Sequence, residues 1–196
     1  MEDRIMTVKD IFSMLGGICA IAGFVPYIRA ILLKQTKPAK ATWVIWATLD
    51  TITFFGMYSK HALNGQMIGI VTGVWVVVVL ALKYGDPGWT KLDKSCYCGA
   101  FVGIILWVAF DSPVIGIMIS LSIIFLGSIP TFVSAWKDPS KENKLGWAIY
   151  WFSCVFTLAA LPGWTLEDAA QPIIFFLIET VMIYILFVRP RTLSVL

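Results

Sequence analysis

One stretch of the sequence occurs twice, and this internal repeat limits the possible folds more than any other feature. A shift of 104 residues lays residues 23–58 on residues 127–162 without a gap. A proline, a lysine-containing segment and a tryptophan recur in the same order. The identical pairs are Gly23/Gly127, Pro26/Pro130, Lys37/Lys141, Lys40/Lys144, Trp43/Trp147, Ile45/Ile149 and Thr53/Thr157. Internal repeats in a membrane chain are typical of transporters built from repeated units.

Seven apolar runs follow one another along the chain. About 20 apolar residues are needed to cross about 30 Å of hydrocarbon. Composition agrees with a membrane protein, because 59% of the residues are apolar and only 14% are charged, against about a quarter charged in soluble domains. We therefore expect an all-α integral membrane protein with seven transmembrane helices, at residues 8–33, 41–59, 66–84, 95–110, 114–136, 145–162 and 171–188.

The repeat accounts for the number of spans. Residues 1–88 would form a first three-helix repeat, residues 89–111 a linker helix, and residues 112–196 a second three-helix repeat. The unpaired linker helix lets both repeats enter the membrane in the same direction. The sequence thus predicts two parallel repeats in a 3+1+3 arrangement, related by an axis along the membrane normal.

The basic residues are distributed unevenly between the connections. With the N-terminus outside, 12 of the 15 Lys and Arg residues fall on the inner side. Cytoplasmic connections carry an excess of Lys and Arg. We therefore expect a multi-pass protein of the plasma membrane, with an outer N-terminus and a cytoplasmic C-terminus, and no cleaved signal peptide.

The 3+1+3 layout and the repeated proline resemble a known superfamily. Each repeat has a proline near the inner end of its first helix, Pro26 or Pro130, followed by a lysine-rich segment. This pattern is similar to that of the PQ-loop and SWEET (MtN3) superfamily of transporters. Tyr27 and Thr131 stand where PQ-loop proteins have glutamine. The resemblance implies alternating access, and the matched prolines are expected to be hinges.

The same resemblance points to further positions of the substrate site. SWEET transporters bind sugar with a tryptophan and an asparagine from each repeat. In this chain Phe54 and Leu158 align with the tryptophans, and Thr72 and Phe176 align with the asparagines. Phe54 and Thr72 are therefore expected at the substrate site. The sugar-binding set itself is absent, so the resemblance does not identify a sugar as the solute.

Two acidic residues lie inside apolar runs, near the middle of the membrane. Asp50 is in the second run and Glu179 is in the seventh. A charged group at a helix centre costs about 2.5–3.5 kcal/mol on insertion scales, so such groups usually face a partner or a pathway. Burial favours the uncharged form of a carboxylic acid, which makes either residue a candidate proton carrier. The alternative interpretation is a neutral, hydrogen-bonded structural acid.

Aromatic residues share a helix face with these acids. Trp43, Trp46 and Asp50 have the spacing of one helical face, and Trp147 and Tyr150 occupy the matching face of the sixth run. Aromatic rings beside carboxylates could bind a cation by cation–π contact. Trp43 and Trp147 also fit the tryptophan belt of a membrane interface. We therefore expect Trp46 and Tyr150 to be walls of the substrate site.

These residues favour a membrane transporter for a small polar or cationic solute, with coupling to protons as an open alternative. An enzyme is not expected, because no nucleophile–base pair and no metal-ligand spacing is present. No cofactor, metal or nucleic-acid partner is expected, and the expected partners are the lipid bilayer and the solute. A homo-oligomer is left open. The runner-up is a ligand-binding receptor or sorting protein without net transport, as in the KDEL-receptor branch of the superfamily.

Overall fold

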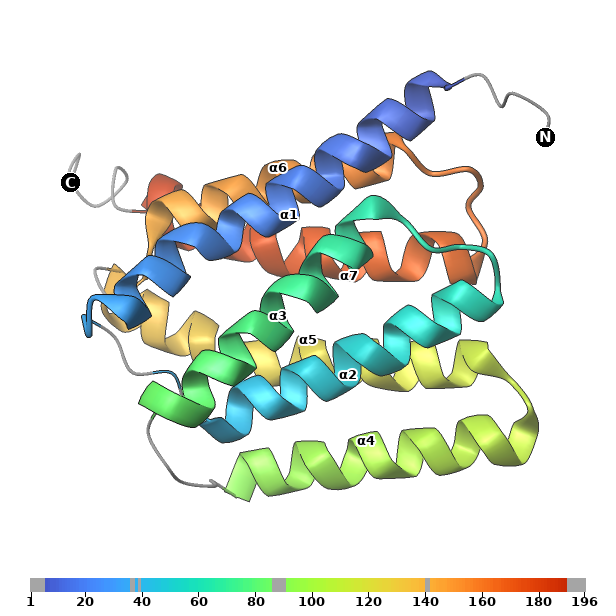
Figure 1. Cartoon of the computed structure of the whole chain (residues 1–196), viewed down its shortest axis with the longest axis horizontal. Helices are drawn as coiled ribbons and strands as arrows, with labels where there is room; N and C mark the ends of the chain where they lie inside the picture. Colours follow the sequence, from blue (N-terminus) through green and yellow to red (C-terminus); the bar gives the residue numbers. More distant parts are fainter. Residues whose placement is uncertain (1–5, 36–37, 39, 86–90, 140–141, 190–196) are drawn as a thin grey trace.

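The computed structural model of the chain describes residues 6–35, 38, 40–85, 91–139 and 142–189. These residues form seven α-helices, and a π-helix, η2, continues the last one (Figure 1). The helices are α1 (Val8–Leu32), α2 (Lys40–Ser59), α3 (Gly65–Tyr84), α4 (Lys91–Phe110), α5 (Pro113–Lys137), α6 (Lys144–Ala159) and α7 (Leu166–Ile183), with η2 at Tyr184–Val188.

The observed helices follow the apolar runs, and they differ mainly at their first residues. α7 begins at Leu166, five residues before the predicted run. The reason is local capping, since the side chain of Thr165 accepts a hydrogen bond from the backbone N–H of Asp168. Asn64 caps α3 in the same way through the N–H of Met67. Hydropathy finds the apolar part of a helix, whereas polar caps decide where the helix starts.

Six of the helices form a ring, and α4 lies outside it. α1 packs against α3 and α6, α2 packs against α3 and α5, and α7 packs against α5 and α6. The ring order is therefore α1, α3, α2, α5, α7, α6. α4 packs against α5 and α2 at the edge of the bundle (Figure 1).

Successive helices run in opposite directions, so the connections gather at two ends of the bundle (Figure 1). The start of α1 and the α2–α3, α4–α5 and α6–α7 connections lie at one end, called the N-terminal end below. The end of α1, the starts of α2, α4 and α6, and the end of η2 lie at the other, called the C-terminal end.

Glycines allow α1 and α3 to approach closely. A Cβ atom added to Gly17 would lie 2.6 Å from the backbone oxygen of Gly65, and one added to Gly69 would lie 2.7 Å from the oxygen of Gly17. Any larger residue would push the two backbones apart. Small residues have this role at helix interfaces in membranes, where van der Waals packing replaces the hydrophobic driving force.

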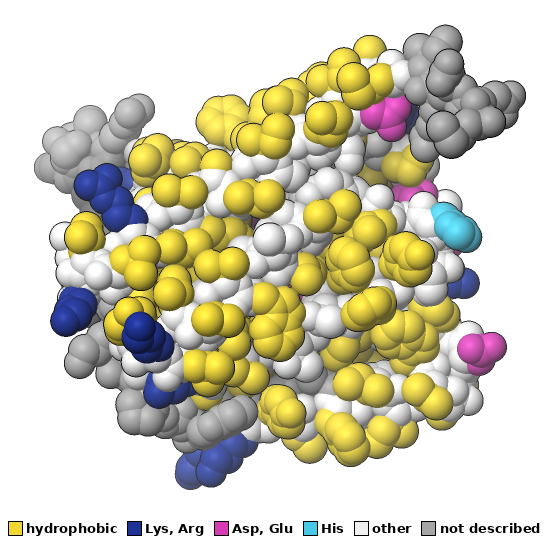
Figure 2. All heavy atoms as spheres, viewed as in Figure 1, with side chains coloured by type: hydrophobic (Ala, Val, Ile, Leu, Met, Phe, Trp, Pro, Cys, Tyr) yellow, Lys and Arg dark blue, Asp and Glu magenta, His cyan; other side chains and the backbone are white. Residues whose placement is uncertain are grey.

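The surface of the bundle is apolar along the helices and charged at the ends. On the face in Figure 2 hydrophobic side chains cover the broad middle, Lys and Arg gather mainly at the C-terminal end, and Asp and Glu lie at the N-terminal end. Three described helical segments, Val8–Leu32, Gly65–Tyr84 and Leu166–Val188, are long and apolar enough to cross a membrane. The fold is therefore all-helical in the described residues and has the character of a membrane protein.

Candidate functional site

The two predicted carboxyl groups are buried within the helix ring. Asp50 on α2 is 5% exposed, and its Oδ1 has no hydrogen-bond partner among the described residues. Glu179 on α7 is partly exposed as a residue, but its Oε2 is buried and also has no partner there. Buried polar atoms without partners are rare in native proteins, so each calls for a physical explanation.

Tyr150 on α6 packs against an apolar cluster that Phe175 of α7 also contacts. Phe175 packs in turn on the cluster that contains Leu49 and Ile178, the sequence neighbours of Asp50 and Glu179. The Tyr150 ring makes an edge-on contact with Phe24 of α1, with ring centres 5.3 Å apart. The ring also occupies the space beside Gly23, where an added Cβ would lie 2.9 Å from the ring carbons. The apolar residues around them therefore place Asp50, Glu179 and Tyr150 in the same part of the bundle.

An aromatic cluster extends from Tyr150 towards the C-terminal end. Phe24 contacts Trp43, with ring centres 6.4 Å apart, and Trp43 contacts Trp46 at 5.4 Å. Trp43 also packs on Tyr27 at 5.1 Å and donates a hydrogen bond from Nε1 to the Tyr27 hydroxyl at 3.2 Å. The predicted wall residue Trp46 is thus linked to Tyr150 through Trp43 and Phe24. We call Phe24, Tyr27, Trp43, Trp46 and Tyr150 the aromatic cluster.

A buried chain of polar side chains crosses the bundle nearer the N-terminal end. Asn64 Nδ2 donates to Gln171 Oε1 at 2.9 Å, and Gln171 Nε2 donates to Gln66 Oε1 at 2.9 Å. Gln66 Nε2 lies 3.0 Å from Ser153 Oγ, which donates to the backbone oxygen of Gly16 at 2.6 Å. We call Asn64, Gln171, Gln66 and Ser153 the amide chain. It joins α1, α3, α6 and α7, and sequence reasoning did not predict it.

The amide chain also contacts Cys154. Gln66 Nε2 lies 3.2 Å from Cys154 Sγ. Gln66, Gln171 and Ser153 are each no more than 1% exposed. Two glutamines at the starts of apolar runs are the one signal in the sequence that could have revealed the amide chain. Their partnership could not be inferred, because it depends on which helices are neighbours.

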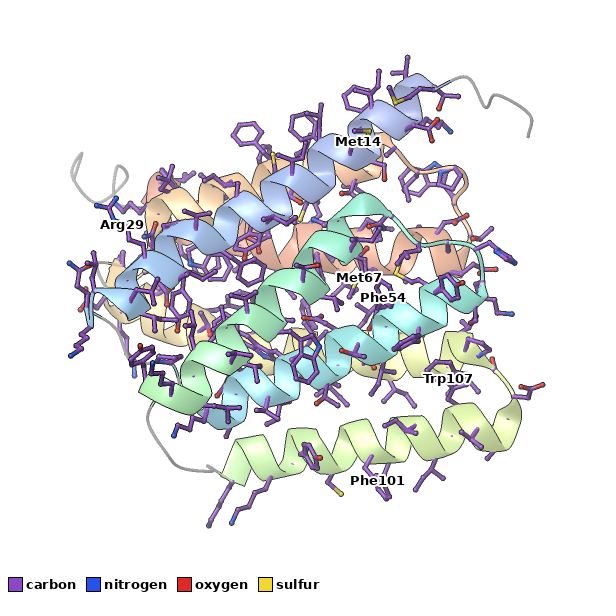
Figure 3. The ribbon with its side chains drawn as sticks, in the orientation of Figure 1. Met14, Arg29, Phe54, Met67, Phe101 and Trp107 are labelled. Atoms are coloured by element: carbon purple, nitrogen blue, oxygen red, sulfur yellow. The ribbon has the colours of Figure 1, made fainter. Side chains whose placement is uncertain are left out.

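The two positions carried over from the family alignment lie elsewhere. Thr72 is exposed on α3, and its hydroxyl donates to the carbonyl of Ile68 at 2.8 Å. Phe54 is half-buried in the apolar cluster around Met57 and Met67, and Figure 3 shows Phe54 and Met67 between α2 and α3. No described contact joins Thr72 or Phe54 to the two carboxyl groups.

Of the two predicted hinge prolines, one has a described environment. Pro26 lies inside α1, where its ring faces Gly146 at the start of α6, 3.8 Å from an added Cβ. Pro130 lies within the bounds of α5, and its side chain is outside the described residues. Pro172 is a further proline inside a helix, next to Gln171 in α7. Because proline lacks an N–H group, each removes one hydrogen bond from its helix.

Comparisons with known proteins add no family to this picture. No family model, no curated protein and no solved structure matches the chain. The described residues also contain no group of three or more His, Cys, Asp or Glu side chains that could hold a metal ion. The features that point to a function are therefore the carboxyl groups, the aromatic cluster and the amide chain.

Proposed function

We propose that the chain is a seven-span membrane transporter that moves a small polar or cationic solute by alternating access. The observation that carries this proposal is the pair of buried carboxyl oxygens without described partners, one on α2 and one on α7. A site that is polar, central and incomplete is expected where a solute or proton binds within a membrane. We also propose that the chain is a member of the PQ-loop and SWEET superfamily.

The helix lengths and the ring order support two equivalent three-helix repeats. α1 and α5 each contain 25 residues, and α2 and α6 begin 104 residues apart, at Lys40 and Lys144. Exchanging α1, α2 and α3 with α5, α6 and α7 leaves the ring order unchanged. This is the relation expected between parallel repeats.

Equivalent residues of the two repeats also make equivalent contacts. Tyr150 of α6 packs on Gly23 of α1, and Trp46 of α2 lies beside Gly127 of α5, 3.9 Å from an added Cβ. The hydroxyl groups of Thr53 and Thr157 donate to the carbonyls four residues earlier, at 3.0 and 2.8 Å. These contacts favour a transporter in which the repeats meet across the α1–α6 and α2–α5 interfaces.

The proposal is tested by uptake into proteoliposomes with a panel of amines, amino acids, nucleosides and sugars. We expect uptake of at least one solute, and a loss of about tenfold or more in Glu179→Gln and Asp50→Asn, since a binding charge is removed from a buried site. Glu167→Gln in the first turn of α7 is the matched control, and its uptake should be normal. A proton gradient that drives uptake would support coupling through one of the acids.

A ligand-binding receptor without net transport is the second candidate. The amide chain favours it, because fully buried hydrogen bonds between α3 and both α6 and α7 would hold the proposed repeats together. Tight binding of a solute by the purified protein, without uptake by proteoliposomes, would select the receptor. Uptake that saturates with solute concentration would select the transporter.

A further inference from the structure

Asp50 and Glu179 have no described basic residue beside them. Every described Lys and Arg lies in the first or last turn of a helix or in a connection. Lys9, for example, donates to the backbone oxygen of Leu161 at the N-terminal end. Asp50 and Glu179 therefore need a positive charge or protons from outside the chain, because an unpaired buried charge is costly.

We propose that the solute is an organic cation with a single positive charge, bound by Asp50 and Glu179 against the ring of Tyr150. The inference rests on the proposed function, because it names the solute class of that same site. One carboxyl group binds the cation, and the other is protonated while the solute is bound. Two ionised carboxyl groups beside a single positive charge would leave a net negative charge in the bundle.

A divalent metal ion does not fit this site as well as an organic cation. Calcium takes six to eight oxygen ligands, and magnesium requires near-octahedral oxygen coordination. The described residues provide one unpartnered oxygen each from Asp50 and Glu179, and they contain no three-residue group suited to a metal. Apolar residues fill much of the remaining surroundings, for example Leu49 and Ile178 next to the two acids in the sequence.

The aromatic cluster accounts for the organic part of the solute. Tyr150 packs against the same apolar cluster as Phe175 of α7, and its ring is linked to Phe24, Trp43 and Trp46 by ring contacts. The faces of such rings attract ammonium, guanidinium and pyridinium groups more than they attract uncharged groups of the same shape. A neutral sugar would instead need several hydrogen-bond partners, and the polar side chains of the amide chain are already bonded to one another.

The test compares matched pairs of probes on the full-length protein in lipid nanodiscs. Three cations are used, namely choline, phenethylamine and N-methylpyridinium, each beside an uncharged molecule of the same shape such as dimethylbutanol for choline. Binding is followed by tryptophan fluorescence, since Trp43 and Trp46 are in the cluster, and by calorimetry. We expect at least one cation to bind about tenfold or more tightly than its uncharged partner.

Variants show whether the cation binds at the proposed site or non-specifically elsewhere on the protein. Asp50→Asn and Glu179→Gln should each lose the preference for the cation, whereas Glu167→Gln should keep it. Tyr150→Phe should keep most of the preference, and Tyr150→Leu should lose it, because only the ring is needed for cation–π contact. Size-exclusion profiles and melting temperatures establish that each variant is folded.

The outcomes also distinguish this inference from the proposed function. Equal affinity for every cation and its uncharged partner overturns the inference, and uptake of a neutral solute by proteoliposomes would then leave the transporter proposal standing. A cation that binds with the expected preference and is never taken up overturns the transporter proposal, while the solute class stands. If the preference for the cation survives in Asp50→Asn and Glu179→Gln, the cation binds elsewhere and the proposed binding site is wrong.

Discussion

At the scale of single residues, Tyr150 is the side chain around which the candidate site is built. It packs against Gly23 and Phe24 of α1, and Phe175 of α7 contacts the same apolar cluster. Gly23 is required at this point because its missing Cβ provides the space for the tyrosine ring. The counterpart position in the second half of the chain, Gly127, is less tightly packed.

This difference predicts unequal effects of the same substitution at two equivalent positions. Gly23→Ala would place a methyl group 2.9 Å from the Tyr150 ring, and overpacking of this kind costs about 1–3 kcal/mol. Gly127→Ala meets its nearest atom at 3.9 Å, so it should be neutral or stabilising, since alanine favours the helix over glycine. Thermal unfolding in detergent measures both. A larger loss in Gly127→Ala would contradict the described packing.

At the scale of helices, the amide chain is the main polar connection between elements. It links α3 to α6 and α7 and, through Ser153, reaches the backbone of α1. Every described member lies nearer the N-terminal end than the carboxyl groups do. If solute is admitted from that end by a separation of α3 from α6 and α7, these hydrogen bonds have to break. The amide chain is therefore a candidate gate of the proposed transport cycle.

The gate predicts a change in the reactivity of Cys154. Gln66→Leu removes the contacts of Gln66 Nε2 with Ser153 and Cys154 and leaves Gln171 with an unpaired donor, at a cost of about 1–3 kcal/mol. In a background in which the other three cysteines are replaced by alanine, a thiol reagent should label Cys154 faster in this variant. Gln35→Leu, in the exposed turn after α1, is the control. Equal labelling rates in all three proteins would argue against a gate.

At the scale of the whole molecule, charge and hydropathy divide the bundle into an apolar middle and two different ends. Basic side chains at the C-terminal end contact aromatic rings, as Arg189 does with Trp136 at 4.1 Å and Lys83 with Tyr84 at 5.1 Å. Trp and Tyr are enriched at both membrane interfaces, whereas an excess of Lys and Arg is typical of the cytoplasmic side. This arrangement supports the proposal that the C-terminal end faces the cytoplasm.

The proposed orientation predicts which end is reached from outside a cell. In a cysteine-free background, an impermeant thiol reagent should label Ser59→Cys, at the N-terminal end, in intact cells. It should label Gln35→Cys, at the C-terminal end, only after the membrane is permeabilised. Both positions are exposed, so only the membrane can make the reagent reach one and not the other. The reverse pattern would show that the topology is inverted.

Much of the secondary structure could be predicted from the sequence, because helix formation within an apolar run is a local property. The seven runs correspond to seven described helices, and the errors lie at helix ends, the largest at the start of α7, which Thr165 caps. Asp50 and Glu179 could be selected for the same reason, since an acid within an apolar run is unusual wherever that helix packs. Tyr150 and Trp46 followed from their spacing along single helices.

The neighbours of each helix could not be predicted from these patterns. Thr72 was expected at the site, yet its side of α3 is exposed, because the face that a helix buries depends on the helices around it. Gln66, Gln171 and Ser153 are far apart in the chain, and only the ring order brings them together. The sequence by itself determined the helices and the acids within them. The tertiary structure decided the amide chain and the packing of Tyr150 against α1, since such contacts depend on long-range packing.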